Sequence, residues 1–215
     1  MAEPRLYGYY RSSAAYRVRI ALNLKGLSVV HVPVHLRKGE QQGAAYRARN
    51  PQAMVPWFED DQIALGQSLA IIEYLEETHP TPALLPADHV LRAYTRELAY
   101  IIACDIHPIG NLRVLKKLKA DYGTESEGAA AWNRHWISLG FAAFEAKLGQ
   151  TAGRFAVGDT PTLADLCLVP QLYNARRFGL DLTPYPRLVA IDEAARALPE
   201  FAHAAPENQP DFEEG

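Results

Sequence analysis

A proline-rich segment, His79–Asp88, divides the chain into two parts of different character. It contains Pro80, Pro82 and Pro86 within ten residues, and prolines so spaced cannot continue a helix and stiffen an exposed connection. A length of 215 residues fits one large domain or two small ones. The break therefore predicts two domains, residues 1–81 and residues 88–215.

Before the break, strand-like and helical patterns alternate. Aromatic and β-branched runs indicate strands, whereas apolar residues spaced three or four apart indicate helices. We expect strands at residues 6–10, 29–36, 55–58 and 63–65, and helices at residues 14–25, 41–49 and 68–78. The order is β-α-β-α-β-β-α, and the first β-α-β unit should be parallel and right-handed.

After the break, the strand pattern nearly vanishes. Helices are expected at residues 88–121 with a bend or break near Pro108-Ile109-Gly110, and at residues 125–148, 162–178 and 186–198. Thr162 lies three residues before Asp165 at the start of an apolar run, an arrangement typical of a capping box. The fold class predicted is thus a small α/β domain followed by an all-helical domain.

Charge and cysteine content limit the classes of partner. The formal net charge is −3, which argues against a protein that binds nucleic acid or an anionic membrane. Stretches without charged residues are shorter than the roughly 18 residues of a membrane span, and residues 1–5 do not resemble a secretion signal. Cys104 and Cys167 form no framework, so we expect a cytoplasmic protein without a metal site.

The segment Tyr10–Arg19, between the first strand and the first helix, is the first candidate site. Backbone N–H groups at a helix start carry partial positive charge and stabilise anions, including thiolates. Ser12 and Ser13 add hydroxyl donors, and the segment contains no cysteine, so a thiolate has to arrive on a ligand. A simple capping role for either serine explains the same residues and is compatible with ligand binding.

Two further segments of the first part carry polar groups at element boundaries. The Val55–Pro56 bond precedes a short strand and can be cis, which would leave the Val55 backbone to pair with an extended peptide. Gln67 and Ser68 begin the next helix, where an amide, a hydroxyl and backbone N–H groups suit a carboxylate. The alternative for Ser68 is a plain N-cap.

In the helical part, two clusters of polar residues are further candidate sites. His107, Asn111 and Arg113 lie within two turns of the expected bent helix, and the i,i+4 pair of His107 and Asn111 should share one face. An ordinary solvated face is the alternative. Arg176 and Arg177 end another helix, where the helix dipole favours cations in any case.

Together these segments resemble the zeta-class glutathione transferases, the family of maleylacetoacetate and maleylpyruvate isomerases. The resemblance follows family order over nearly the whole chain, and the Ser-Ser to Arg-Val-Arg segment is specific to this class. The matching residues are 10–13 with 17–22, 50–51 with 55–56, 67–68 with 70–77, 80–82 with 84–86, 105–108 with 111–115, 158–165, 168–171 and 181–186.

The resemblance implies a thioredoxin-like N-terminal domain, an all-helical C-terminal domain, a homodimer and glutathione as cofactor. It places Ser12 beside the glutathione sulfur, Ser13 near it, and Arg11 and Arg177 on substrate carboxylates. It assigns the remaining glutathione contacts to Gln41 on the glycyl side, Val55 on the cysteinyl backbone, Gln67 and Ser68 on the γ-glutamyl end, and His107, Asn111, Leu112 and Arg113 from the helical part.

The activity implied is the glutathione-dependent cis–trans isomerisation of a dicarboxylate enone, maleylacetoacetate to fumarylacetoacetate in tyrosine and phenylalanine catabolism. Alternatives are maleylpyruvate isomerisation in gentisate degradation, general glutathione conjugation, and a non-catalytic module of the same fold. Two positions depart from the family: Ala14 replaces the usual Cys or Thr, and Gly110 stands where bacterial relatives often carry Asn. Ala14 puts thiol-transferase activity in doubt, since it can form no mixed disulfide.

Overall fold

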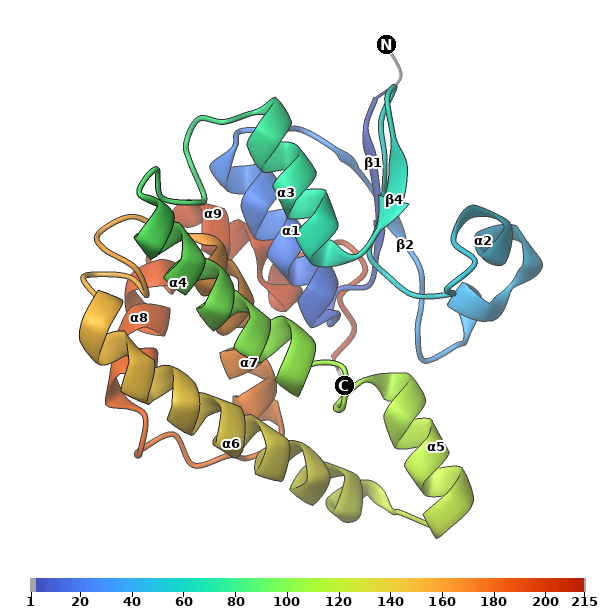
Figure 1. The fold of residues 1–215 in the computed structure, drawn as a ribbon. Helices are drawn as coiled ribbons and strands as arrows, with labels where there is room; N and C mark the ends of the chain where they lie inside the picture. The colour runs from blue at the N-terminus through green and yellow to red at the C-terminus, as the bar shows by residue number, and fades with distance from the viewer. Residues whose placement is uncertain (1–2, 215) are drawn as a thin grey trace. The chain divides into compact units, whose positions relative to one another are not determined.

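The computed structural model describes residues 3–214 (Figure 1). The chain folds into two compact units: the first holds the chain up to Leu84 together with the segment from Ala197 onward, and the second holds Leu85–Arg196. The sequence pattern grouped the C-terminal segment with the helical part. It packs with the first unit because its helix α9, Pro199–Ala204, lies against the first helix of the chain.

The first unit is built on one four-stranded sheet. Its strands are β1 Arg5–Gly8, β2 Val30–Pro33, β3 Trp57–Glu59 and β4 Ala64–Gly66, in the order β2-β1-β3-β4. β1 pairs with β2 in parallel, whereas the β1–β3 and β3–β4 pairs are antiparallel. The predicted element order and the predicted parallel first pair are confirmed, with strands shorter than the sequence pattern indicated.

Helices cover both faces of this sheet (Figure 1). α1 and α3 pack side by side on one face, and α2 lies on the other. The helical segments of this unit are α1 Ser13–Leu24, η1 Glu40–Gln42, α2 Ala44–Arg49, α3 Ser68–Thr78, α9 and η3 Pro206–Asn208. The predicted helix at residues 41–49 is split at Gly43, and α9 and η3 were not predicted.

The second unit is helical. Its segments are α4 His89–Tyr100, η2 Ile101–Ile106, α5 Leu112–Tyr122, α6 Ser126–Thr151, α7 Leu163–Arg177 and α8 Pro186–Arg196. The predicted break in the long helix is confirmed, and it begins earlier than expected because η2 is a π-helix. Gly140 lies directly against η2, where a Cβ would collide with the Ile106 side chain.

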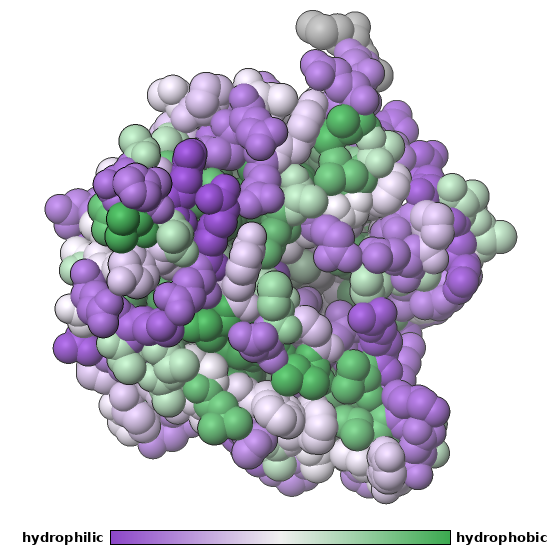
Figure 2. Space-filling view, in the orientation of Figure 1, coloured by the Kyte–Doolittle hydropathy of each residue, from purple (hydrophilic) through white to green (hydrophobic). Residues whose placement is uncertain are grey.

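The surfaces of the helices are mostly hydrophilic, with apolar side chains visible over α5 and the adjoining end of α6 (Figure 2). α5 is amphipathic and none of its residues is fully buried. Among the described residues, no helix combines the length and the apolar character that crossing a membrane demands.

The start of α7 is held by the predicted capping box. Asp165 is fully buried, and its carboxylate accepts hydrogen bonds from the backbone N–H of Thr162 at 2.7 Å and of Ala156 at 2.8 Å. The Thr162 hydroxyl donates a further bond at 3.0 Å. Burial raises the pKa of Asp165 to about 6, although these donors act in the opposite direction. One carboxylate thus satisfies three buried donor groups.

We expect Asp165→Ala to lower the free energy of unfolding by about 2–4 kcal/mol, because buried N–H donors lose their acceptor. Chemical denaturation followed by circular dichroism measures the change. Asp121→Ala serves as the control, since the carboxylate of Asp121 lies on the surface of α5 in an i,i+4 pair with Lys117. An equal effect of the two substitutions would contradict the role assigned to Asp165.

Candidate active site

Ser12 forms the boundary between β1 and α1. It is the N-cap of α1, and its Oγ accepts a hydrogen bond from the backbone N–H of Ala15 at 3.2 Å. Its own N–H donates to the carbonyl of Tyr9 at 2.9 Å, which closes the turn before the helix. The capping interpretation is therefore correct for Ser12.

The cap leaves a donor on the same hydroxyl. A serine hydroxyl has one donor hydrogen and two acceptor lone pairs, and the bond from Ala15 uses only a lone pair. Among the described residues the Ser12 hydroxyl donates to no acceptor, and its side chain is half-buried. Together with the partial positive charge of the helix start, this geometry suits an anion. Ser13 beside it is buried, and Arg11 is half-buried with its guanidinium 5.9 Å from the Tyr10 ring centroid.

The loop before β3 contains the predicted Val55–Pro56 bond, which is cis. The Val55 side chain packs against the buried cluster of Tyr7, Val34 and Tyr46. Burial raises the pKa of Tyr46 to about 12, so its phenol stays protonated and donates to the carbonyl of Met54 at 2.7 Å. The residue just before Val55 is thus fixed by a buried side chain.

Gln67 and Ser68 differ from the expected arrangement at the start of α3. Gln67 occupies the N-cap position with φ 68°, a left-handed conformation that is rare for a residue other than glycine. The alternative that Ser68 is a plain N-cap is therefore wrong, since Gln67 occupies that position. Its buried hydroxyl instead accepts a hydrogen bond from Nη1 of Arg17 at 3.3 Å, while the Gln67 amide donates to Gln52 at 2.9 Å.

Arg17 and Gln52 were not singled out from the sequence. Arg17 is only 2% exposed, and its guanidinium contacts the first residue of α3. The available signal was the pair Arg17 and Arg19 within the otherwise apolar helical stretch Ala14–Leu22, since an arginine on a buried helix normally has a structural or ligand-binding reason. The sequence gives no such signal for Gln52, because its contact with Gln67 depends on a loop conformation.

Gln41 lies in η1 and is also buried. Its amide nitrogen donates to the carbonyl of Leu36 at 3.4 Å. Its Oε1 has no hydrogen-bond partner among the described residues. Buried acceptors are normally satisfied, so this oxygen can take a donor from a ligand.

In the second unit, the residues His107–Arg113 do not form one helical face. η2 ends at Ile106 with His107 as its C-cap, a turn follows, and α5 begins after its N-cap Asn111. The Asn111 side chain accepts a hydrogen bond from the Arg113 N–H at 3.1 Å, so the predicted shared face of His107 and Asn111 is wrong. Leu112 is the first residue of α5. The turn is also fixed by Trp132, whose indole N–H donates to the carbonyl of Ile109 at 3.0 Å.

The two arginines at the end of α7 have different surroundings. Arg176 pairs with the buried carboxylate of Asp192 at 2.7 Å. Burial raises the pKa of Asp192, and the arginine opposes that shift. Arg177 is exposed, with its guanidinium 4.1 Å from the Phe178 ring centroid and its Nη2 donating to Asn174 at 3.3 Å. Both arginine side chains are exposed, but that of Arg176 is held in the ion pair with Asp192, whereas that of Arg177 packs against the Phe178 ring.

The folds of the two units define a class of protein: a thioredoxin-like sheet unit with a helical unit is the architecture of the glutathione S-transferases. Family models support this on sequence. The N-terminal domain of glutathione S-transferases matches residues 6–83, and the C-terminal domain matches residues 137–198.

Curated relatives narrow the class. A probable maleylacetoacetate isomerase of Vibrio cholerae is 53% identical, with 96% of this chain and 97% of the relative covered. A maleylpyruvate isomerase of a Ralstonia species is 51% identical, with 96% and 99% covered. The chain belongs to the glutathione S-transferase family, in the zeta class that contains these isomerases.

Solved structures agree with this assignment. A holo structure of maleylpyruvate isomerase, a bacterial zeta-class enzyme, superposes with a TM-score of 0.96 at 50% identity, covering 97% of this chain and all of the other. A maleylacetoacetate isomerase of Anaeromyxobacter dehalogenans superposes with a TM-score of 0.89 at 48% identity, covering 99% and 98%. That structure holds dicarboxyethyl glutathione and citrate in its active site.

The neighbouring arginines at the end of α7 generate a prediction about stability. Arg176→Ala should lower the free energy of unfolding by about 1–3 kcal/mol, because the buried carboxylate of Asp192 loses its nearest cation. Arg177→Ala should change it by less than about 1 kcal/mol, as expected for an exposed side chain. Thermal denaturation of both variants provides the comparison, and equal destabilisation would contradict the different roles assigned to them.

Proposed function

We propose that this protein is a glutathione-dependent isomerase that converts maleylacetoacetate to fumarylacetoacetate in tyrosine and phenylalanine catabolism. The named relatives match over almost their whole length, and one related structure holds a glutathione derivative together with a carboxylate ligand. Both observations support a substrate that carries carboxylates and a reaction that uses a thiol.

The observation that carries this proposal is the hydrogen bonding of the Ser12 hydroxyl, which accepts from the helix and can still donate. Ser12 holds the start of α1 with a lone pair while its hydroxyl hydrogen stays available. Both cysteines of the chain, Cys104 and Cys167, lie in the second unit, whereas Ser12 lies in the first. The site is therefore suited to a thiolate that a ligand brings.

The residues of the first unit fit glutathione. The buried, unpartnered Oε1 of Gln41 accepts from the glycyl side, and the Val55 backbone pairs with the cysteinyl part. Gln67 and Ser68 bind the γ-glutamyl end, where buried Arg17 adds positive charge beneath the Ser68 hydroxyl. Ser13 lies beside Ser12 at the start of the helix, and His107, Asn111, Leu112 and Arg113 complete the set of glutathione-binding residues.

Glutathione, when bound, supplies the thiol that adds to the substrate double bond and leaves again once the bond has rotated. A free cysteine thiol has a pKa of about 8.5 and is mostly protonated at neutral pH. Ser12 donates to the sulfur, and the start of α1 favours its negative charge. Each unit of pKa depression corresponds to about 1.4 kcal/mol of preferential stabilisation of the thiolate.

Arginines bind the substrate. Arg11 and Arg177 bind carboxylates, since a planar guanidinium recognises a carboxylate at two points. Arg113 or His107 stabilises the negative charge that develops on the substrate oxygen during the reaction. Ala14 offers no thiol for a mixed disulfide, so thiol-transferase activity is not part of this proposal.

Maleylpyruvate is the second candidate substrate, since a maleylpyruvate isomerase is nearly as similar in sequence. Both substrates are cis-enone dicarboxylates, and they differ only in the tail. Initial rates on both, measured side by side, identify the physiological substrate by the ratio of their kcat/KM values. A higher kcat/KM for maleylpyruvate would replace the first assignment.

The proposed cellular context is the cytoplasm, with the protein as a homodimer. Residues 1–81 form the glutathione-binding domain in this proposal, and residues 88–215 the substrate-side domain. Exposed apolar residues on α4, namely Val90, Leu91 and Tyr94, support association of two copies. Sedimentation equilibrium measures the mass in solution.

The experiment that tests the function follows maleylacetoacetate spectrophotometrically with and without glutathione. Isomerisation should require glutathione and leave its concentration unchanged. Consumption of glutathione with a chlorodinitrobenzene-type electrophile but no isomerisation would indicate a conjugating transferase instead. Lack of both activities and of binding to immobilised glutathione would indicate a non-catalytic module.

Substitution of Ser12 separates its two roles. Ser12→Ala should lower kcat about ten-fold or more, since the sulfur loses a donor, and should also cost about 1 kcal/mol of stability through the lost cap. Ser12→Thr keeps both the hydroxyl and the cap and should retain most of the activity. A near-normal kcat in folded Ser12→Ala would remove the hydroxyl from the mechanism.

Substitution of Arg177 tests carboxylate binding. Arg177→Ala should raise the KM for dicarboxylates about ten-fold or more, with little effect on neutral electrophiles, because only the former need the guanidinium. Arg176→Ala, assayed on its folded fraction, is the matched control and should leave both KM values near normal. Equal effects of Arg177→Ala on charged and neutral substrates would contradict the assignment.

A further inference from the structure

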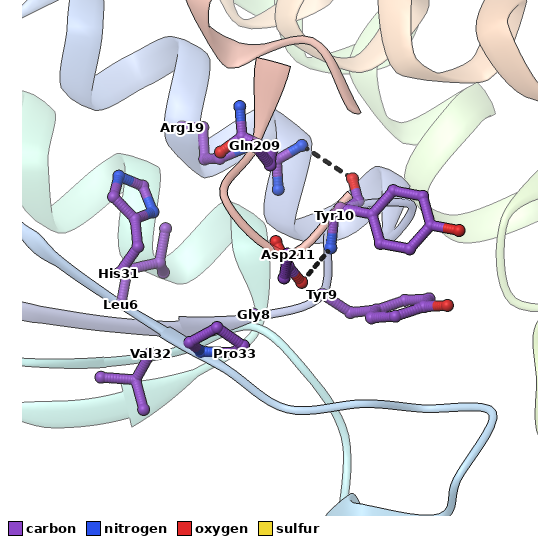
Figure 3. A pocket seen from close by; sticks show the side chains of 10 residues that line it. All are labelled: Leu6, Gly8, Tyr9, Tyr10, Arg19, His31, Val32, Pro33, Gln209 and Asp211. Carbon is purple, nitrogen blue, oxygen red and sulfur yellow. Dashed lines mark hydrogen bonds between the residues drawn. The ribbon is translucent and has the colours of Figure 1, made fainter. Parts of the chain in front are cut away.

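The C-terminal tail, defined here as residues 209–214, is bound to the segment that precedes Ser12. Oδ2 of Asp211 accepts a hydrogen bond from the backbone N–H of Tyr10 at 2.9 Å (Figure 3). The Tyr10 hydroxyl donates to the carbonyl of Glu213 at 3.1 Å, and the rings of Tyr10 and Phe212 meet edge to face with centroids 5.5 Å apart. Three successive tail residues thus contact one tyrosine.

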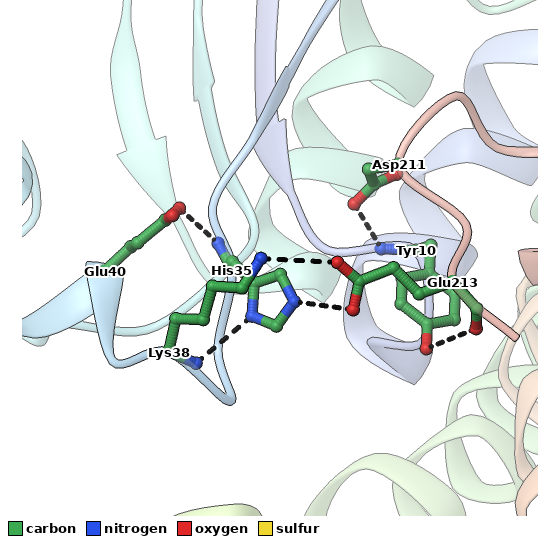
Figure 4. Close-up of polar contacts among 6 residues, drawn as sticks. All are labelled: Tyr10, His35, Lys38, Glu40, Asp211 and Glu213. Carbon is green, nitrogen blue, oxygen red and sulfur yellow. Dashed lines mark hydrogen bonds and ion pairs between the residues drawn. The ribbon is translucent and has the colours of Figure 1, made fainter. Parts of the chain in front are cut away.

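The same tail binds a second segment of the first unit. The carboxylate of Glu213 pairs with Nε2 of His35 at 3.0 Å and with Nζ of Lys38 at 3.3 Å (Figure 4). Hydrogen bonds from His35 and then Lys38 lower the pKa of Glu213. His35 is itself held in place by two hydrogen bonds. Its ring Nδ1 accepts from the backbone N–H of Lys38 at 3.1 Å, and its backbone N–H donates to the carboxylate of Glu40 at 2.6 Å.

Both segments lead directly into residues of the proposed glutathione site. Tyr10 lies two residues before Ser12, and the Ser12 N–H bonds the carbonyl of Tyr9. The loop from His35 leads into Gln41, whose amide donates to the carbonyl of Leu36 in the same loop. The tail therefore connects the residue proposed for the sulfur with the residue proposed for the glycyl end.

We infer that Asp211 and Glu213 are positioning residues that hold the Ser12 segment and the Gln41 loop in place for glutathione. This inference rests on the proposed function. A site whose parts are already ordered binds its ligand more tightly, because less conformational entropy is lost on binding. Neither tail residue contacts the reacting atoms in this scheme, so the tail acts mainly on glutathione affinity.

Charge exchange between Glu213 and Lys38 tests the inference. Glu213→Lys and Lys38→Glu should each raise the Kd for glutathione, measured by calorimetry, and its KM by about three-fold, while kcat at saturating glutathione stays near normal. The double variant reverses the pair and should recover part of the lost affinity. Glu214→Lys is the matched control, since Glu214 is the adjoining exposed glutamate, and it should bind like the unaltered protein.

Asp211 offers an independent variant with a conservative rescue. Asp211→Ala removes the acceptor of the Tyr10 N–H and should weaken glutathione binding about five-fold or more, whereas Asp211→Asn keeps an acceptor oxygen and should bind almost normally. Thermal denaturation of each variant establishes that the measured protein is folded.

The outcomes separate this inference from the proposed function. Glutathione binding by the unaltered protein with an unchanged Kd in Glu213→Lys, or equal weakening by Glu214→Lys, would overturn the role of the tail alone. A loss of kcat at unchanged KM would overturn it as well. Absence of glutathione binding by the unaltered protein would overturn the proposed function together with this inference.

Discussion

The bond between the Ser12 hydroxyl and the start of α1 is the interaction on which this molecule depends. A serine that caps a helix uses a lone pair, so the cap and the donation to a ligand do not compete. The cap fixes the oxygen at the point where the helix dipole is most favourable to an anion. One residue thus gives the fold its first helix boundary and gives the site a donor beside the proposed thiolate.

Other contacts of the first unit hold the segments around Ser12 and the start of α3 in place. The buried guanidinium of Arg17 donates to the Ser68 hydroxyl, and Ser68 is the first residue of α3 while Gln67 occupies the N-cap position. The C-terminal tail reaches Tyr10 and His35, which precede the two segments proposed to contact glutathione. In the second unit Arg176 pairs with the buried carboxylate of Asp192, whereas the neighbouring Arg177 packs against the Phe178 ring. Structural roles and proposed ligand-binding roles therefore fall on neighbouring residues.

Local patterns predicted most of the fold. The β-α-β-α-β-β-α order, the end of the first helix near residue 25, the capping box at Thr162 and the break before α5 all depend on residues close together in sequence. Contacts between distant residues escaped prediction. The tail contacts join residues about two hundred positions apart, and α9 is too short to show a period. The shared face expected for His107 and Asn111 failed because η2 and a turn interrupt the helix between them. Ser12 and Val55 lie in motifs that the local sequence reveals, and their roles toward a ligand stay predictions, whereas the contact of Gln52 with Gln67 depends on tertiary geometry alone.

Ionisation of a bound thiol at the start of α1 is the step that most needs direct measurement. Ultraviolet absorbance of the thiolate, titrated against pH in the complex with glutathione, measures its pKa. We predict a midpoint well below the value of about 8.5 for a free thiol, with a shift back towards that value when the Ser12 hydroxyl is removed. A midpoint at the free value in the unaltered protein would contradict the role given to this helix start.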